Sequence, residues 1–372
     1  MLTLAEREGV DLTVVGPEAI LERGTADLFR EHGRPILGPS RAAAALEWSK
    51  AFSKHFMARH GVPTAGFRVC ETPEDARAVL DLPEFRPPVV VKADGLAAGK
   101  GVVVAESTAE AEAAITEAMI DRRFGDAGAT LVVEECLTGP EVSFFALCDG
   151  TRAIPLGTAQ DHKRIFDEDR GPNTGGMGAF SPSPLIGDTD AAAIMARIVQ
   201  PVVDGMRMEG APYVGFLYVG LMLTSSGPKV IEFNVRFGDP EAQVVLPRLR
   251  GAFAKALLAA ANGDLHDVAL TPAPDAMVGV VMASRGYPAT SESGRLISGL
   301  DSATHAGALV FHSGTRAESG GIATAGGRVL TVVGRGARFD DAMTTAYAAL
   351  HHIQFDGMQF RKDIGKKAIA AK

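Results

Sequence analysis

Residues 89–104 read VVVKADGLAAGKGVVV, a Gly-rich loop between two runs of valine. The valine runs predict two strands, at 88–93 and 101–106, joined as a hairpin. Glycines let backbone N–H groups approach an anion closely, and lysines at both ends of the loop can direct positive charge into the same concavity. The pattern therefore predicts a phosphate cover within a β-hairpin. Its residues are Lys92, Gly95, Gly99, Lys100 and Gly101.

The loop does not match the common phosphate-binding motifs. A Walker A loop needs a glycine, four residues and then Gly-Lys-Ser/Thr. Here Asp94 stands at the first glycine position and Gly101 at the Ser/Thr position. A P-loop also opens a helix, whereas this loop opens a strand. From the loop alone, a surface hairpin with solvated lysines remains an alternative.

A second informative stretch, PKVIEFNVRFGDPE, occupies residues 228–241. Alternate residues of a strand share a face, so Val230, Glu232, Asn234 and Arg236 are expected on one side and a core face on the other. Carboxylate and amide oxygens suit Mg²⁺, which usually takes one or two protein carboxylates plus substrate phosphates. Arg236 can stabilise a transferring phosphoryl group. A Glu–Arg salt pair on an exposed sheet is the alternative.

Two further segments carry candidate binding groups. Residues 131–143 (LVVEECLTGPEVS) predict a buried strand whose end can present backbone groups to an adenine edge, with Glu141 accepting from a ribose hydroxyl. An ordinary strand and turn is the alternative there. Residues 161–179 predict a long irregular connection, and such loops are usually functional or disordered. Its polar residues suit a polyhydroxylated anion, with His162 positioning substrate rather than moving protons.

Composition excludes several classes of protein. The 372 residues suggest two or three domains, and 46% hydrophobic with 22% charged residues excludes a wholly disordered chain. No apolar run is long enough for a membrane span, and the net charge of −8 together with the absence of a basic run disfavours nucleic acid as a partner. Three widely spaced cysteines without a CxxC argue against disulfides or zinc and favour a reducing cytoplasm.

The order of predicted elements suggests three parts. Residues 1–40 alternate strand (10–15), helix (19–32) and strand (35–37), but two strands cannot make a stable sheet. Something is therefore missing from this part, or another element covers it. A helix is expected over 41–60. The predicted domains are a partial N-terminal α/β domain (1–40), a central domain (41–265, with a lid subdomain at about 62–136) and a C-terminal α+β domain (275–372).

Together these stretches resemble one family. VKADGLAAGKGV at Val91, GPNTGGMGA at Gly171 and EFNVRFGDPE at Glu232 are its most specific matches. EWSKAFSKHF at Glu47 and TAQDHKR at Thr158 also fit. The chain is similar to the phosphoribosylamine–glycine ligase family (glycinamide ribonucleotide synthetases), within the ATP-grasp superfamily. The resemblance covers essentially the whole chain, in the family's order.

The resemblance implies a fold and an activity. The fold is α/β and α+β: an ATP-grasp fold, a partial N-terminal parallel α/β (pre-ATP-grasp) domain and a small C-terminal α+β domain. The activity is ATP-dependent ligation of glycine to 5-phosphoribosylamine through glycyl phosphate, in purine biosynthesis. ATP and Mg²⁺, with Mn²⁺ as a substitute, are the implied cofactors. Partners are small molecules, with no nucleic acid or membrane, and the chain can be a monomer.

The resemblance also assigns residue roles by position. Arg236 and Lys100 are the expected catalytic groups. ATP would bind through Lys50, Lys92, Gly95, Gly99, Lys100, Gly101, Glu134, Leu137 and Glu141. Glu232 and Asn234 would hold the metal. The substrates would contact Asp161, Lys163, Asn173, Thr174, Gly175, Gly176, Met177, Arg236 and Asp239.

One departure from the family bears on activity. Members open with a strand and a GxGGREHA turn, which this chain lacks. We expect a truncated or misassigned start rather than a natural variant. Two other functions remain open: a related ATP-grasp ligase acting on another acid and amine, and an inactive ATP-binding fragment. ADP release that requires both glycine and phosphoribosylamine would distinguish the ligase from both.

Overall fold

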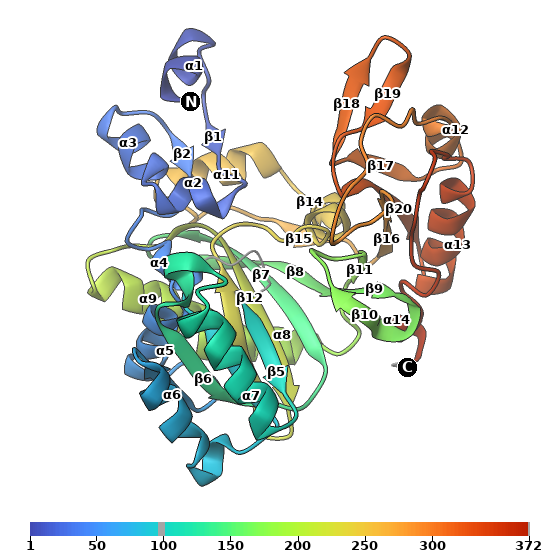
Figure 1. Cartoon of the computed structure of the whole chain (residues 1–372). Coiled ribbons are helices and arrows are strands. Elements are labelled where there is room, and N and C mark those ends of the chain that lie inside the picture. Colours follow the sequence, from blue (N-terminus) through green and yellow to red (C-terminus); the bar gives the residue numbers. More distant parts are fainter. Residues whose placement is uncertain (96–100, 371–372) are drawn as a thin grey trace. The chain divides into compact units, whose positions relative to one another are not determined.

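The computed structural model describes residues 1–95 and 101–370, and the chain divides into two units (Figure 1). Each unit is built from several chain segments. The first unit comprises Met1–Pro155, Asp188–Phe237 and Ala252–Ala269. The second comprises Leu156–Gly187, Gly238–Gly251 and Leu270–Lys372. No described helix is long and apolar enough to cross a bilayer.

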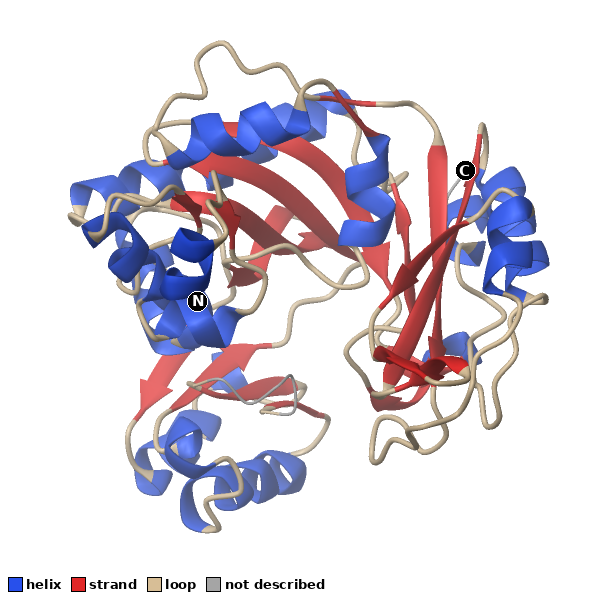
Figure 2. Ribbon diagram, turned by 90° about the horizontal axis from the view of Figure 1, so that it is seen from above, coloured by secondary structure: helices blue, strands red, loops and turns tan. Residues whose placement is uncertain are grey.

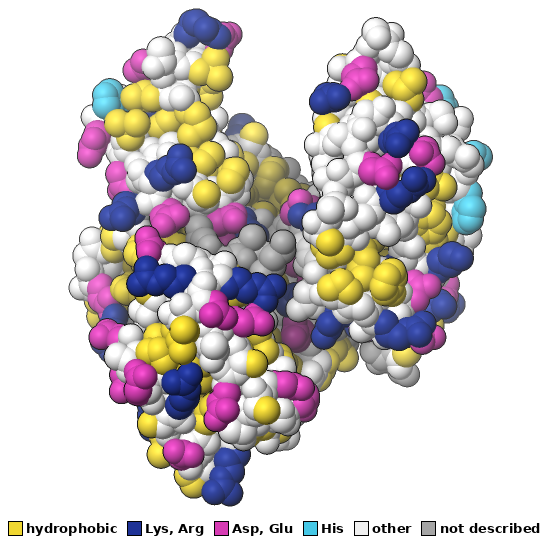
Figure 3. Space-filling view, viewed as in Figure 1, with side chains coloured by type: hydrophobic (Ala, Val, Ile, Leu, Met, Phe, Trp, Pro, Cys, Tyr) yellow, Lys and Arg dark blue, Asp and Glu magenta, His cyan; other side chains and the backbone are white. Residues whose placement is uncertain are grey.

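The N-terminal segment of the first unit is a small α/β arrangement. Its elements are α1 (Leu2–Arg7), β1 (Thr13–Val14), α2 (Glu18–Glu22), α3 (Thr25–Glu31) and β2 (Ile36–Leu37). The two strands pair in parallel, as predicted, but each has only two residues. The predicted helix 19–32 is broken at Gly24, whose φ of +76° suits glycine. Figure 3 shows hydrophobic side chains gathered on this part of the surface. Leu4 and Leu28 of this segment are exposed.

Two helices replace the single helix predicted over 41–60: α4 (Ala45–Trp48) and α5 (Lys50–Arg59). The break falls at Ser49, which is extended (φ −124°, ψ 108°) and caps α5 by accepting from the Phe52 N–H. Its hydroxyl also donates to the Asp94 carboxylate at 3.1 Å. The break thus starts α5 beside the segment that enters the Gly-rich loop.

A four-stranded antiparallel sheet carries that loop. Its strand order is β3 (Phe67–Cys70), β6 (Leu131–Glu135), β4 (Val89–Ala93) and β5 (Val102–Ala105). The pairing of β4 with β5 confirms the predicted hairpin. Helices α6 (Pro73–Leu80) and α7 (Thr108–Ile115) supply apolar residues to the core of this sheet. The sheet therefore has a hydrophobic core of its own.

A second antiparallel sheet carries the acidic strand. In this unit it has the order β7 (Glu141–Asp149), β12 (Val214–Thr224) and β13 (Gly227–Asn234). Helix α11 (Phe253–Ala261) packs against β7 and β12 of this sheet. Figure 2 shows helices lying across one face of the sheet. Residues 188–208 form α8 (Asp188–Ile194), a π-helical turn and α9 (Gln200–Met208).

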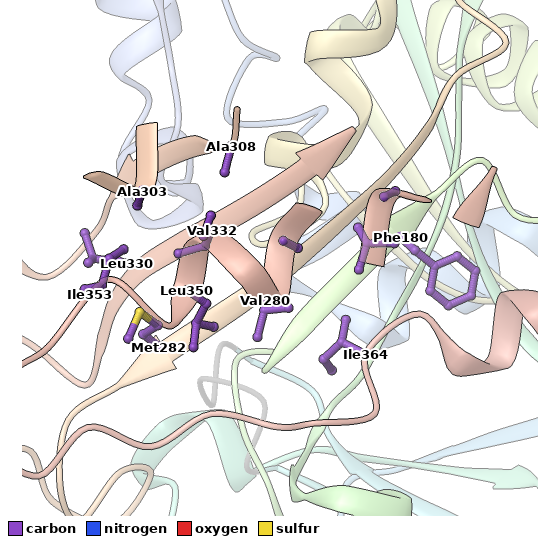
Figure 4. Close-up of a cluster of buried hydrophobic side chains, with 14 of the residues drawn as sticks. Phe180, Val280, Met282, Ala303, Ala308, Leu330, Val332, Leu350, Ile353 and Ile364 are labelled. Atoms are coloured by element: carbon purple, nitrogen blue, oxygen red, sulfur yellow. The ribbon is translucent and has the colours of Figure 1, made fainter. Parts of the chain in front are cut away.

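The second unit is built on a larger antiparallel sheet. Its strands are β8 (Ala153–Asp161, which begins in the first unit), β11 (Gly178–Ser181), β16 (Ala276–Ala283), β20 (Arg328–Gly336) and β17 (Leu309–His312). Helix α13 (Phe339–Leu350) packs on β20 and β16. Val280, Val332 and Leu350 are fully or almost fully buried in the core between them (Figure 4). The α+β class predicted for the C-terminal part is confirmed.

The structure corrects the expectation of an irregular connection at 161–179. Strands β9 (Arg164–Phe166) and β10 (Arg170–Asn173) pair antiparallel, and β11 follows. The turn between β9 and β10 is stabilised from a distant part of the chain. The Arg361 guanidinium donates to the Arg164 carbonyl at 3.0 Å and to the Asp169 carboxylate at 2.9 Å. The composition of residues 161–179, rich in glycine and charged residues, does not indicate a contact with Arg361.

Candidate nucleotide and substrate site

The Lys92 side chain leaves β4 on the face that also presents Glu134 of β6. Val90 pairs with Glu134 and Lys92 with Val132, so Lys92 and Glu134 are diagonal neighbours on one face. The Lys92 Nζ lies 3.0 Å from Glu134 Oε1 and donates to the Ile231 carbonyl at 3.3 Å. Lys92 is only 5% exposed. A buried ammonium is thereby placed between β6 and the acidic strand.

The acidic strand contains a β-bulge that the sequence did not reveal. Gly220 pairs with Glu232 and Leu221 with Val230, which leaves Ile231 without a partner in the ladder. The expected alternation therefore fails at Val230, which is fully buried rather than on the polar face. From Glu232 onward it holds, because Phe233 and Val235 are buried while Glu232 and Asn234 are half-buried. The bulge exposes the Ile231 carbonyl to Lys92.

Lys50 begins α5 and faces the same region. Its backbone N–H donates to the Asp94 carbonyl at 3.2 Å, and its Nζ lies 3.4 Å from the Gly95 carbonyl. Burial lowers its pKa, while the charge of Glu232 acts in the opposite direction and that of Lys92 in the same direction. Lys50 therefore interacts electrostatically with both Lys92 and Glu232. Gly99 and Lys100 lie outside the described residues.

Lys54 is a buried group that the motif analysis missed. It is 2% exposed, and its Nζ lies 2.8 Å from Glu134 Oε2 and donates to Thr64 Oγ1 at 2.7 Å. Burial lowers its pKa to about 8. Its spacing could have revealed it: residues four apart share a helix face, so Lys54 lies below Lys50 in EWSKAFSKHF.

The residues predicted to contact the adenine and ribose lie around the β6–β7 connection. The Glu134 carboxylate meets Lys54 and Lys92, so its side chain is engaged in ion pairs within the core. Leu137 lies in the connection, and Glu141 is the exposed first residue of β7, opposite Met222 of β12. The assignment of these residues to adenine and ribose stays a prediction.

Arg236 is held by two carboxylates that were not predicted as site residues. Its Nε donates to Glu18 Oε2 at 3.1 Å, and its second terminal nitrogen lies 3.1 Å from Glu47 Oε1. The other Glu47 oxygen accepts from the Val235 N–H at 2.7 Å. Burial raises the pKa of Glu47 to about 7, against the opposing charge of Arg236. Glu18 of the N-terminal segment and Glu47 of the EWSKAFSKHF stretch thus both bind the residues that follow the acidic strand.

The remaining substrate residues lie in the second unit. Thr174 donates through its N–H (2.7 Å) and its hydroxyl (2.8 Å) to the Lys163 carbonyl, and Gly176 N–H donates back to Thr174 Oγ1 at 2.9 Å. These bonds form a tight turn after Asn173. Met177 is fully buried against Ile165, so only its backbone faces the turn. Asp161 ends β8, next to the buried His162.

Two residues missed by the motif analysis hold that turn. Arg328 donates to the Gly175 carbonyl and the Asp239 carbonyl, both at 2.6 Å, and pairs with the Asp239 carboxylate at 3.0 Å. The Tyr287 hydroxyl accepts from the Gly175 N–H at 2.9 Å. Asp239 is therefore joined to the 174–176 turn, although the two are far apart in sequence.

Comparison with known proteins identifies the family. Models of the phosphoribosylglycinamide synthetase N domain, ATP-grasp (A) domain and C domain match residues 1–47, 48–242 and 277–367. The chain belongs to the phosphoribosylglycinamide synthetase family. It is therefore an enzyme of the ligase class, built on the ATP-grasp fold that the motifs predicted.

Individual relatives agree with this assignment. The chain is 51% identical to the phosphoribosylamine–glycine ligase of Xylella fastidiosa strain 9a5c over 371 residues, which cover 99% of this chain and 84% of the relative. It is 48% identical to that of Ralstonia nicotianae over 370 residues, covering 99% and 87%. The crystal structure of the Thermotoga maritima phosphoribosylamine–glycine ligase matches with a TM-score of 0.82 at 36% identity, over 88% of this chain and 81% of that one.

More distant structures share the fold alone. The crystal structure of the biotin carboxylase–β-γ-ATP complex from Campylobacter jejuni has a TM-score of 0.72 at 17% identity, covering 98% of this chain and 80% of that chain. At that identity the match supports the ATP-grasp architecture and no residue role.

Proposed function

We propose that the chain joins glycine to 5-phosphoribosylamine with ATP, giving glycinamide ribonucleotide, ADP and phosphate. Membership of the phosphoribosylglycinamide synthetase family supports this reaction. A relative named phosphoribosylamine–glycine ligase is 51% identical to the chain over 99% of its length. The observation that carries it is structural. Half-buried Lys50 interacts electrostatically with buried Lys92 and with Glu232, which supports a single site for cationic phosphate ligands and a metal ligand.

The phosphates of ATP are proposed to bind between the Gly-rich hairpin and the acidic strand. Lys50 and Lys92 would neutralise phosphate oxygens, and removing them from water strengthens that attraction. Leu137 and Glu141, at the β6–β7 connection, would hold the adenine and ribose, and Glu134 is the third proposed contact. The remaining proposed phosphate contacts are Gly95, Gly99, Lys100 and Gly101.

The donors of the acidic strand fit a divalent metal. Glu232 and Asn234 offer one carboxylate and one amide oxygen on the same face of β13, hard ligands of the kind Mg²⁺ or Mn²⁺ takes. Among the described residues, no group of three His, Cys, Asp or Glu forms a complete metal cage. Two protein ligands suit a metal whose other ligands are phosphate oxygens and water. When bound, the ion would neutralise phosphate charge.

The chemistry proceeds in two displacements. A glycine carboxylate oxygen attacks the γ-phosphorus of ATP, the bond to the β–γ bridging oxygen breaks, and ADP leaves with that electron pair. The amine of phosphoribosylamine then attacks the carbonyl carbon of glycyl phosphate; phosphate leaves and the nitrogen loses a proton. No protein nucleophile is needed, so positioning and charge neutralisation account for catalysis.

Protein groups for the acyl phosphate and the amine substrate are proposed by position. Arg236, oriented by Glu18 and Glu47, would contact the acyl phosphate, and Asp239 would contact glycine. The Thr174–Met177 turn, with Asn173, Asp161 and Lys163, would bind phosphoribosylamine. The turn needs glycine at Gly176, where a side chain would collide with Pro240, and a side chain at Gly175 would crowd Arg328.

The test is an ADP-release assay with purified protein. Phosphoribosylamine is generated in the cuvette from ribose 5-phosphate and ammonia. The proposal predicts ADP release only when ATP, Mg²⁺, glycine and phosphoribosylamine are all present, with one glycinamide ribonucleotide formed per ADP. Nucleotide binding without this dependent turnover would contradict it.

A further inference from the structure

Lys54 is a buried cation that no proposed substrate contact explains. Its side chain is 3% exposed, and its Nζ meets Glu134 Oε2 at 2.8 Å and Thr64 Oγ1 at 2.7 Å. Burying an ammonium is costly unless it is paired and hydrogen-bonded. With these partners, Lys54 is already bonded within the core, so it is poorly placed to ligate phosphate itself.

The Glu134 carboxylate lies between two ammonium groups. Lys54 takes one oxygen, and Lys92 approaches the other at 3.0 Å. That second oxygen, Oε1, accepts no well-aligned hydrogen bond from any described residue, so the contact with Lys92 is one of charge. Together the three side chains carry one excess positive charge in a buried setting. An excess of this sign favours an anion beside Lys92.

Lys54 is also connected to the acidic strand. The Thr64 hydroxyl that accepts from Lys54 donates in turn to the Val230 carbonyl at 2.7 Å. The Val230 N–H donates to the Pro63 carbonyl at 2.8 Å. Val230 directly precedes the bulged Ile231, whose carbonyl accepts from Lys92, and Glu232 follows. One lysine thus links α5, β6 and the strand that carries the proposed metal ligands.

We propose that Lys54 is a positioning residue for nucleotide binding: it balances the charge of Glu134, so that Lys92 keeps its own charge for phosphate, and it fixes β13 through Thr64. The inference rests on the proposed nucleotide site and deepens it. Without Lys54, Glu134 would pair with Lys92 alone and neutralise it. The loss would be specific to ATP, because the partners of Lys54 lie on the nucleotide side of the proposed site.

The test compares Lys54→Met with the double variant Lys54→Met/Glu134→Gln. Dissociation constants for Mg·ADP are measured by calorimetry, and KM values for ATP and glycine by ADP release. Lys54→Met should weaken Mg·ADP and raise the KM for ATP by about tenfold, as expected for coupled neighbours in one ion-pair network. The KM for glycine should stay within about twofold. The double variant should recover most of the loss, because it removes the unmatched carboxylate charge.

Lys229→Met is the matched control. Lys229 pairs with the adjacent Glu135 at 2.9 Å, but both side chains are partly exposed, at 28% and 37%. Its removal should leave the constants for Mg·ADP and ATP unchanged. A purely structural role for Lys54 predicts a lowered unfolding temperature with wild-type nucleotide constants. That outcome, or a double variant no better than Lys54→Met, overturns the proposal.

A second variant keeps the test decisive if Lys54→Met does not fold. Thr64→Val keeps the shape of the side chain and removes the hydroxyl between Lys54 and Val230. It should raise the KM for ATP about threefold and leave that for glycine unchanged; an unchanged KM for ATP contradicts the proposal. The calorimetric readout needs no turnover. If the wild-type chain binds Mg·ADP but forms no glycinamide ribonucleotide, the proposed reaction fails while the role of Lys54 is still tested.

Discussion

Each unit contains a cluster of cations and carboxylates around at least one buried cation, and the two clusters differ in charge balance. In the first unit, Lys54 and Lys92 share the single carboxylate of Glu134. In the second, Arg361 and Lys367 are matched by Asp169 and Asp363. We refer to these as the lysine triad and the Arg361 cluster. The lysine triad carries one net positive charge that can attract an anionic ligand, whereas the charges of the Arg361 cluster cancel.

Hydrogen bonding and pKa values follow the same division. The Arg361 side chain is 1% exposed and donates to two carboxylates and one carbonyl, so its donors are used within the protein. Its guanidinium holds the pKa of Asp363 well below its usual range. In the triad, burial instead lowers the pKa of Lys54. A cluster that stabilises its own charges is structural, whereas one left with unbalanced charge is prepared for a ligand.

The largest expected effect is the loss of turnover in Glu232→Ala. If the lysine triad and Glu232 form one site for a metal-bound nucleotide, removing the Glu232 carboxylate should lower kcat for Mg·ATP at least about 10³-fold. That factor corresponds to several kcal/mol of lost charge stabilisation in the transition state. The unfolding temperature should change little, because Glu232 is half-buried. Glu135→Gln, on a neighbouring exposed pair, is the control for a general change of charge. Wild-type turnover in Glu232→Ala would remove the metal assignment.

Arg361→Met should have the opposite profile. Breaking a buried ion pair by removing one partner costs about 3–5 kcal/mol; we expect about 3, because Asp169 is 39% exposed. Urea unfolding measures the loss. Below the unfolding temperature, the affinity for Mg·ADP should equal that of the wild type. Reduced affinity in the folded variant would mean that the Arg361 cluster is not purely structural.

The sequence allowed good prediction wherever local pattern sets the structure. Valine runs around a Gly-rich loop predicted the β4–β5 hairpin, and Glu232 with Asn234 was correctly placed on the polar face of β13. Both results depend on neighbours within a few residues. The ATP-grasp fold and the family were likewise accessible, because their motifs are short and specific.

Features that depend on distant partners could not be predicted. The bulge at Ile231 arises from pairing with Gly220 and Leu221, and Arg361 meets Asp169 from almost two hundred residues away. Met177 was expected to bind substrate, yet its side chain packs in a core made by Ile165 and Ala283. A buried lysine such as Lys54 is also hard to infer, since lysines usually lie on the surface.

Titration of Glu47 should make the free energy of unfolding of the first unit depend on pH near neutrality. The Arg361 cluster should contribute no such dependence in that range. The pKa of Glu47 is raised from 4.5 to about 7, so between these values the native state binds a proton that the unfolded state has lost. The free energy of unfolding should therefore fall as pH rises through this window, by about 2 kcal/mol between about pH 5 and pH 7. Glu47→Gln does not titrate and should remove this slope in urea unfolding.

The carboxylates of the Arg361 cluster titrate in the other direction. The pKa of Asp169 and that of Asp363 are lowered, so the stability they contribute is present above pH 4 and lost only in more acidic solution. Arg361→Met should leave the slope between pH 5 and pH 7 intact. A slope that persists in Glu47→Gln and disappears in Arg361→Met would reverse the contrast between the two units.

The smallest expected effect comes from the helix cap beside the lysines. Ser49 caps α5 and also hydrogen-bonds the Asp94 carboxylate. Thr72 caps α6 by accepting from the Asp75 N–H at 3.1 Å, and α6 holds no predicted site residue. Replacing either by Ala should cost about 1 kcal/mol of stability. Only Ser49→Ala should also raise the KM for ATP, about twofold, because Asp94 positions the entry to the Gly-rich loop. Equal KM values in the two variants would show that the cap stabilises α5 without ordering the nucleotide site.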